Sequence, residues 1–225
     1  MTGYTAVVLA GGRARRLGGI TKPAVDVGGR PMLARVLAAV ADAGHVIVVG
    51  PPLAGLAGPQ PVWTREDPPG AGPVAALRAA VALLPPGAGT VVVLAADLPF
   101  LDAATVARLR AAVTGPGATG PDAAGPGEAG TGATVPGAAV LVDDGGRDQY
   151  LAAAWTATAL RQALSTVEDD RMSSVYAAVP RVDRVAATGY RAGVEPWRDV
   201  DDPVGLDRAR ASWEHSRQDD PTPQG

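Results

Sequence analysis

Short apolar runs that end abruptly at glycine or at a charged residue divide the chain into expected β-strands. Residues 5–10 form one such run, rich in β-branched side chains, and Gly11-Gly12 ends it. Further strands are predicted by similar runs at 46–50, 62–63, 91–96 and 140–142. The run at 91–96 gives the strongest strand signal, because six apolar residues follow one another without a break.

Between these runs, apolar side chains recur at the spacing of helix turns. Pro31 stands where a helix can begin without losing a hydrogen bond, and Gly44 stands where that helix can end. Asp102 and Asp202 occupy positions typical of helix N-caps. The remaining helices are expected over 74–84, 103–113, 151–160 and from Pro203 onward.

The alternation of strands and helices predicts an α/β fold, a single Rossmann-like domain with a mostly parallel sheet and helices on both faces. We assign residues 1–214 to this domain. Residues 114–137 are dominated by Gly, Pro, Ala and Thr without periodicity, which predicts a disordered low-complexity insertion. Residues 215–225 are expected to form a flexible tail.

Composition narrows the class of protein. The chain has 225 residues, 47% of them hydrophobic, and no apolar run of membrane-spanning length. Its formal charge of −3 gives no reason to expect a nucleic-acid partner. The absence of cysteine excludes disulfides and thiolate metal sites, and no signal-peptide pattern opens the chain, so a cytoplasmic location is expected.

The segment after the first expected strand carries the strongest chemical signal. Gly11 to Lys22 contains two glycine pairs and the cations Arg13, Arg15, Arg16 and Lys22. Backbone N–H groups of such a loop can form an anion-binding concavity, and arginine matches phosphate oxygens in pairs. The segment lacks both the Walker pattern and Gly-x-Gly-x-x-Gly. A polyphosphate site is one interpretation, and an ordinary turn with solvated charges is the other.

Two acidic stretches also follow expected strands or extended segments. Asp97 comes directly after 91–96, where a carboxylate is costly unless it is solvated, paired or bound to a metal. Asp199 and Asp201 flank Val200 and share one side of an extended segment. Because Mg²⁺ is usually held by one or two carboxylates together with substrate phosphates, Asp97 is a candidate ligand. Helix capping and simple solvation are the alternatives for these residues.

These motifs resemble those of Rossmann-like nucleotidyltransferases, and most closely those of the molybdenum cofactor guanylyltransferases. The matching stretches are Leu9-Ala10-Gly11-Gly12, Arg16-Leu17-Gly18-Gly19, Lys22, Gly72-Pro73-Val74-Ala75-Ala76, Asp97-Leu98-Pro99 and the segment 199–206. Thr21 departs from the family, which has an aspartate before the lysine, and Asp202 and Val204-Gly205 replace a threonine and an acidic pair.

The resemblance implies transfer of GMP from GTP to the molybdopterin-bound molybdenum cofactor, with release of pyrophosphate and with Mg²⁺ as cofactor. It implies nucleotide contacts from Leu9, Ala10, Gly11, Gly12, Lys22, Asp67 and Asp97, catalytic roles for Arg16, Lys22 and Asp97, and a metal held by Asp97 and Asp201. Molybdoenzymes or cofactor-delivery proteins are the implied protein partners.

Three questions stay open at this level. The family's nucleotide-contacting aspartate matches Asp67 better than its neighbour Glu66, but the spacing to the Gly72-Pro73 turn differs between family members. A related enzyme that uses CTP or another phosphate acceptor fits the same motifs. A non-catalytic nucleotide-binding protein of this fold fits them as well.

Overall fold

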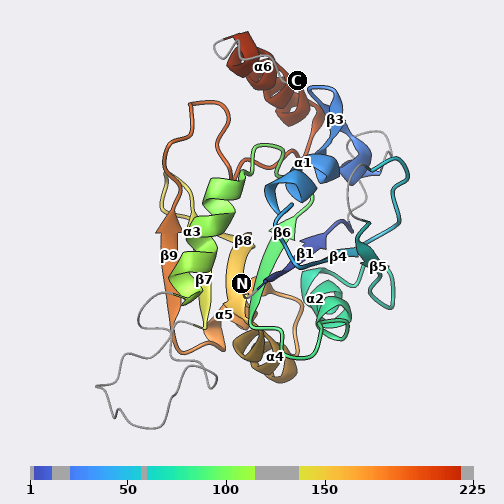
Figure 1. The fold of residues 1–225 in the computed structure, drawn as a ribbon, viewed down its shortest axis with the longest axis vertical. Helices are drawn as coiled ribbons and strands as arrows, with labels where there is room; N and C mark the ends of the chain where they lie inside the picture. Colours follow the sequence, from blue (N-terminus) through green and yellow to red (C-terminus); the bar gives the residue numbers. More distant parts are fainter. Residues whose placement is uncertain (1–2, 12–20, 57–59, 115–136, 219–225) are drawn as a thin grey trace.

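A seven-stranded sheet runs through the computed structural model (Figure 1), which describes residues 3–11, 21–56, 60–114 and 137–218. The strands lie side by side in the order β5-β4-β1-β6-β8-β7-β9. Their bounds are β1 (Thr5–Leu9), β4 (His45–Val49), β5 (Val62–Thr64), β6 (Thr90–Ala95), β7 (Ala138–Val142), β8 (Asp148–Thr156) and β9 (Val182–Ala186). A separate two-stranded hairpin pairs β2 (Asp26–Val27) with β3 (Arg30–Pro31).

The described helices follow the expected pattern of crossovers. They are η2 (Lys22–Ala24), α1 (Met32–Ala39), α2 (Pro73–Val81), α3 (Ala103–Thr114), α4 (Ala157–Thr166), α5 (Met172–Ala177) and α6 (Pro203–Gln218). Strand β1 is parallel to both β4 and β6, β5 is parallel to β4, and β9 is parallel to β7. Only β8 runs antiparallel to its neighbours in this sheet. The predicted mostly parallel α/β fold is confirmed.

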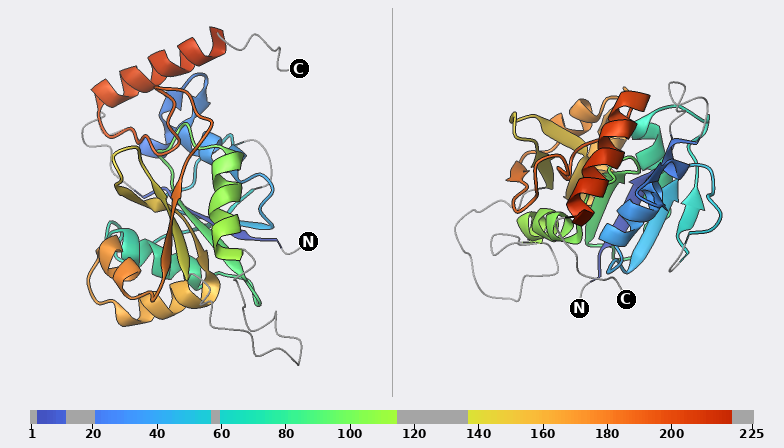
Figure 2. Two further views of the ribbon diagram at one scale, coloured as in Figure 1. Left: turned by 90° about the vertical axis from the view of Figure 1, so that its left-hand side faces the viewer. Right: turned by 90° about the horizontal axis from the view of Figure 1, so that it is seen from above.

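Helices cover both faces of the sheet, and each face has its own core (Figure 2). On one face Val7 packs with Leu77 of α2 and Leu160 of α4. On the other face Val8 packs with Leu33 of α1 and Leu109 of α3. Neighbouring residues of β1 therefore face opposite cores, which explains why that strand is buried at every position and apolar from Ala6 to Leu9.

The prediction of a helix over 151–160 is wrong for the first half of that range. Residues 152–155 belong to β8, where they are buried between β6 and β7. Alanine favours helices, but its small side chain also fits a central strand that is covered on both faces, and here packing outweighs propensity. Helix α4 begins only at Ala157, after Thr156, whose hydroxyl accepts a hydrogen bond from the Ala159 N–H at 3.2 Å.

Helix α6 crosses one end of the molecule, beside the β2–β3 hairpin (Figures 1 and 2). It begins at Pro203, and the Asp202 carboxylate accepts a hydrogen bond from the Gly205 N–H at 2.7 Å, as expected for an N-cap. Trp213 packs onto Gly28, where a Cβ atom would lie 1.9 Å from the indole. The helix continues to Gln218, so the chain is still helical at 215–218, where the sequence suggested a tail.

Two expectations fall on segments outside the described residues. These segments are 115–136, within the predicted insertion, and 219–225, at the end of the predicted tail. Among the helices that the structure describes, none combines the length and the apolar character needed to cross a membrane.

Candidate functional site

Three segments that are far apart in the sequence meet where β1 and β6 end. The two strands are neighbours, with Leu9 opposite Ala95, so Gly11 and Asp97 follow them on the same edge of the sheet. The Nζ atom of Lys22 donates hydrogen bonds to the carboxylates of Asp97 and Asp201. The described ends of the glycine-rich segment, Gly11 and Lys22, therefore lie at the same edge of the sheet as the two acidic stretches.

The acidic stretch 199–201 is oriented by the residue at its centre. Val200 is fully buried in a small core with Val27 and Phe100, at the base of α6. In an extended segment its neighbours Asp199 and Asp201 then face the opposite side. This alternation explains how Asp201 reaches Lys22 while Asp199 lies beside Asp201 in the same short segment.

Partial burial and the close contacts between these side chains shift the pKa values of Lys22 and Asp199. The Lys22 and Asp97 side chains are 13% and 21% exposed, whereas Asp201 is 62% exposed. Burial tends to lower the pKa of Lys22, but the charge of Asp97 and the hydrogen bonds to Asp201 and Asp97 together raise that pKa above its ordinary value. Burial, followed by the hydrogen bond and the charge of Asp201 and then the charge of Asp97, raises the pKa of Asp199 to about 6.

The carboxylates of this group are of the kind that binds a magnesium ion. Within the described ranges, no cluster of three or more acidic or histidine side chains is arranged to hold a metal. Asp97 and Asp201 nevertheless converge on one cation, the ammonium of Lys22. Mg²⁺ commonly takes one or two carboxylates and completes its shell with substrate phosphates and water. The donor set therefore fits Mg²⁺ in the presence of a phosphate-bearing substrate.

At the end of β1, some of the backbone groups that could contact a ligand already make hydrogen bonds within the sheet. The Ala10 N–H donates to the Val49 carbonyl at 2.7 Å, and the Leu9 carbonyl accepts from the Ala96 N–H at 3.0 Å. These groups belong to the sheet, so Leu9 and Ala10 shape the floor of the site. Gly11 is exposed beyond them. Gly12 and Arg16, two further expected site residues, lie outside the residues that the structure describes.

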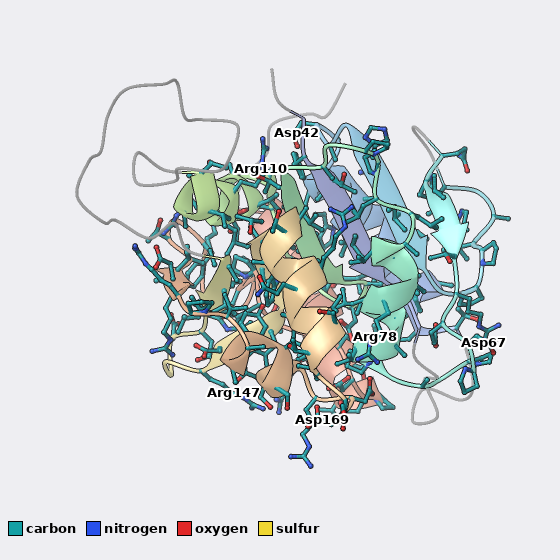
Figure 3. The ribbon with its side chains drawn as sticks, turned by 90° about the horizontal axis from the view of Figure 1, so that it is seen from below. Asp42, Asp67, Arg78, Arg110, Arg147 and Asp169 are labelled. Atoms are coloured by element: carbon teal, nitrogen blue, oxygen red, sulfur yellow. The ribbon has the colours of Figure 1, made fainter. Side chains whose placement is uncertain are left out.

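The two neighbouring acids before the Gly72-Pro73 turn are placed differently. Asp67 is exposed at the edge of the molecule (Figure 3). Glu66 is only 7% exposed, and a Cβ atom on Gly11 would lie 3.5 Å from its Oε1 atom. Its Oε1 accepts a hydrogen bond from the Gly70 N–H at 2.8 Å, but its buried Oε2 has no hydrogen-bond partner among the residues that the structure describes.

Sequence reasoning placed Glu66 second to Asp67, but Glu66 is the one of the two acids that is buried beside Gly11. The two acids are adjacent, and nothing in the spacing to the Gly72-Pro73 turn separates them. The choice depends on which one turns inward beside Gly11, and that is a tertiary contact.

The sheet is mostly parallel, and a glycine, a lysine and carboxylates meet at the ends of neighbouring strands. This arrangement is typical of Rossmann-like proteins that bind nucleotides. Within that class, the chain belongs to the family described as MobA-like NTP transferase domain, which matches residues 6–185. The family is one of nucleotidyltransferases, and the expected enzyme class is confirmed.

Named relatives agree with this membership. A molybdenum cofactor guanylyltransferase of Bradyrhizobium sp. strain ORS 278 is 38% identical over 117 residues, which are 49% of this chain and 55% of that protein. A probable molybdenum cofactor guanylyltransferase of Haloferax mediterranei is 38% identical over 87 residues, 36% of this chain and 41% of that protein. The chain spans about half the length of the curated relatives it matches.

A solved structure shows the same fold. The molybdopterin-guanine dinucleotide biosynthesis protein A of Archaeoglobus fulgidus superposes with a TM-score of 0.66 at 17% identity, over 94% of this chain and 99% of that one. At this level of identity the likeness establishes the fold alone.

Proposed function

We propose that the protein is a guanylyltransferase that transfers GMP from GTP to the molybdopterin-bound molybdenum cofactor and releases pyrophosphate. The observation that carries the proposal is the grouping of Lys22, Asp97 and Asp201 beside Gly11 at the ends of β1 and β6. The choice of guanine and of this acceptor is supported by the names of the curated relatives. The reaction is placed in the cytoplasm, and molybdoenzymes or cofactor-delivery proteins would receive the product.

Each residue of the group has a role that follows from its charge. Lys22 has three N–H donors and uses two of them on Asp97 and Asp201, which leaves one for a phosphate oxygen. Asp97 and Asp201 would hold Mg²⁺, which when bound neutralises negative charge on the triphosphate. Arg16 and the backbone of Gly11 and Gly12 would complete the contacts to the phosphates. In-line phosphoryl transfer asks the protein chiefly to position groups and balance charge.

The base would lie against Glu66. Guanine offers two adjacent donors, N1–H and the N2 amino group, whereas cytosine presents an acceptor at the equivalent ring nitrogen. A carboxylate accepts hydrogen bonds and repels a ring acceptor, so the Oε2 of Glu66, which has no partner in the described part of the chain, favours guanine. Asp67, exposed on the same loop, would face the remainder of the nucleotide.

The decisive test measures pyrophosphate release from the purified protein incubated with Mg-GTP or Mg-CTP and the molybdenum cofactor. We expect release with GTP that depends on both the acceptor and Mg²⁺. Equal or faster release with CTP would instead identify a cytidylyltransferase. Nucleotide binding without any pyrophosphate release would identify a non-catalytic nucleotide-binding protein.

A further inference from the structure

The loop that carries Glu66 is closed by its own hydrogen bonds. The Oε1 atom of Glu66 accepts the Gly70 N–H at 2.8 Å, and the Pro68 carbonyl accepts the Ala71 N–H at 3.2 Å. One end of the loop leaves β5 in the sheet, and its last residue, Gly72, stands directly before α2. The orientation of Glu66 therefore depends on how the Gly72 end of the loop is held.

Helix α2 takes its N-terminal cap from a distant segment. Gly72 occupies the N-cap position and has no side-chain oxygen to accept hydrogen bonds from the first turn. Asp170, between α4 and α5, fills this role. Its Oδ1 atom accepts the Val74 N–H at 2.9 Å and the Ala75 N–H at 3.4 Å. The dipole of α2 also favours a negative charge at this end of the helix.

The backbone of Gly72 makes room for this carboxylate. Its φ is +97°, and a Cβ atom there would lie 1.4 Å from the Oδ2 atom of Asp170. A side chain at position 72 would be strained by the backbone conformation and would also displace the carboxylate. The close approach of Asp170 to Gly72 thus fixes the residue at which the loop ends and α2 begins.

A second contact joins the same two segments in the opposite direction. Arg78 of α2 donates from Nε and Nη2 to the Leu164 carbonyl at 3.3 and 3.2 Å, and its Nη2 also donates to the Val167 carbonyl (Figure 3). Val167 is the C-cap residue of α4. Each segment therefore pairs backbone groups that the other leaves unpaired at a helix end. Asp170 holds the start of α2 from a segment that α2 itself anchors.

We propose that Asp170 is a positioning residue for base selection, because it fixes the Gly72 end of the loop and so keeps Glu66 turned toward the base. The inference rests on the proposed function, since it takes Glu66 as the residue that contacts guanine. Asp170 acts through α2 and Gly72 and makes no contact with the substrate. Without the cap, one end of the loop is released, Glu66 loses its fixed orientation, and the preference for guanine over cytosine declines.

The test compares wild type with Asp170→Ala, Asp170→Asn and Asp169→Ala. Asp169 supplies the matched control, because it is the adjacent acid and caps α5 by accepting the Arg171 N–H at 3.0 Å and the Ser174 hydroxyl at 2.8 Å. Each alanine variant thus removes one helix cap, so a general loss of stability is matched between them. Asparagine caps almost as well as aspartate, so Asp170→Asn should behave like wild type.

Hydrogen exchange measures the loop in the absence of any substrate. We expect the Gly70 and Ala71 amides to exchange at least about fivefold faster in Asp170→Ala than in wild type. In Asp170→Asn and Asp169→Ala the same amides should stay within about twofold of wild type. Unchanged exchange in Asp170→Ala, or equal acceleration in Asp169→Ala, would overturn the proposal.

Calorimetry with Mg-GTP and Mg-CTP measures the consequence for base selection. We expect Asp170→Ala to lower the ratio of the GTP affinity to the CTP affinity at least about fivefold, and the other two variants to keep it within about twofold. An unchanged ratio in Asp170→Ala would overturn the proposal. An equal loss in Asp170→Asn would mean that the charge acts and not the cap, and it would also overturn the proposal.

The same measurements separate this proposal from the proposed function. If wild type transfers no GMP, the proposed function fails, whereas exchange and the binding ratio still decide the role of Asp170. Equal affinities of wild type for GTP and CTP would refute base selection by Glu66, and the role of Asp170 in it would be refuted with it.

Discussion

Replacing Asp97 by Asn removes one negative charge from the centre of the proposed site and little else. Asp97 follows β6, and its carboxylate accepts a hydrogen bond from Lys22. Asparagine has the same shape and keeps one oxygen acceptor, so Lys22 can retain that contact. The charge that a hard divalent cation requires is lost.

The cost to stability should be modest. Lys22 and Asp97 are 13% and 21% exposed, and removing one partner of a buried pair costs up to about 3–5 kcal/mol. Here Lys22 keeps Asp201 and gains a neutral acceptor in place of a charged one. We therefore expect a loss of about 1 kcal/mol, which lowers the Tm by about 2–4 °C in a domain of this length.

The effect on catalysis should be far larger. We expect transfer to fall at least about a hundredfold, equivalent to about 2.7 kcal/mol of transition-state stabilisation. The Kd for GTP should change by less than about threefold, because the contacts of the glycine-rich segment and of Glu66 remain. The assay is pyrophosphate release across a magnesium titration, together with calorimetry of GTP binding.

Asp102→Asn is the matched control. It makes the same chemical change in the same loop, but Asp102 caps α3 and asparagine caps almost equally well. The control should keep wild-type activity and stability. Release by Asp97→Asn within about threefold of wild type at every magnesium concentration would refute the metal assignment.

Three further changes test other parts of the account. Lys22→Ala should lower turnover at least about tenfold through loss of a phosphate contact worth about 1.5–3 kcal/mol, and unchanged kinetics would remove Lys22 from the mechanism. Glu66→Gln keeps an oxygen acceptor for the Gly70 N–H but places an amide donor toward the base. The ratio of kcat/KM for GTP to kcat/KM for CTP should therefore drop at least about tenfold, and an unaltered ratio would contradict base selection by Glu66. Asp42 accepts hydrogen bonds from Tyr4 and Arg110 (Figure 3), and these bonds, above all the one from Tyr4, lower the pKa of Asp42 below 3.8. The ionised carboxylate therefore stabilises the fold at a pH above 3.8, and this stabilisation is lost as the pH falls. Asp42→Asn should therefore reduce the Tm by no more than about 2 °C at pH 7 and by less at about pH 3, and an equal deficit at both would contradict this origin.

The fold could be predicted wherever hydrophobic periodicity was unambiguous. After an initial threonine, the strands at 5–9 and 90–95 are apolar because both faces of the sheet are covered, and a short, β-branched run that ends at turn residues is typical of such a strand. Strand β8 was mistaken for a helix because three consecutive alanines suit either state. Strand β9 was not predicted, since it lies at an edge and its side chains are partly exposed.

The candidate site followed from the same logic, up to the limit of local information. The carboxyl ends of neighbouring parallel strands meet at one edge, so Asp97 was expected beside the glycine-rich segment. The alternation around Val200 placed Asp199 and Asp201 on one side. The inward turn of Glu66 and the stacking of Trp213 on Arg35 depend on how distant segments pack, and no spacing in the sequence encodes them.

The geometry also accounts for Thr21, where the family has an aspartate. A carboxylate directly before the lysine could help to balance and orient its ammonium. In this chain Lys22 obtains two carboxylate partners from other segments, Asp97 from the end of β6 and Asp201 from the approach to α6. A fourth carboxylate, at position 21, would add negative charge to the group of Asp97, Asp199 and Asp201, in which the pKa of Asp199 is already raised to about 6. The neutral residue at 21 is therefore compatible with a charged and oriented Lys22, and the substitution by itself does not argue against an active enzyme.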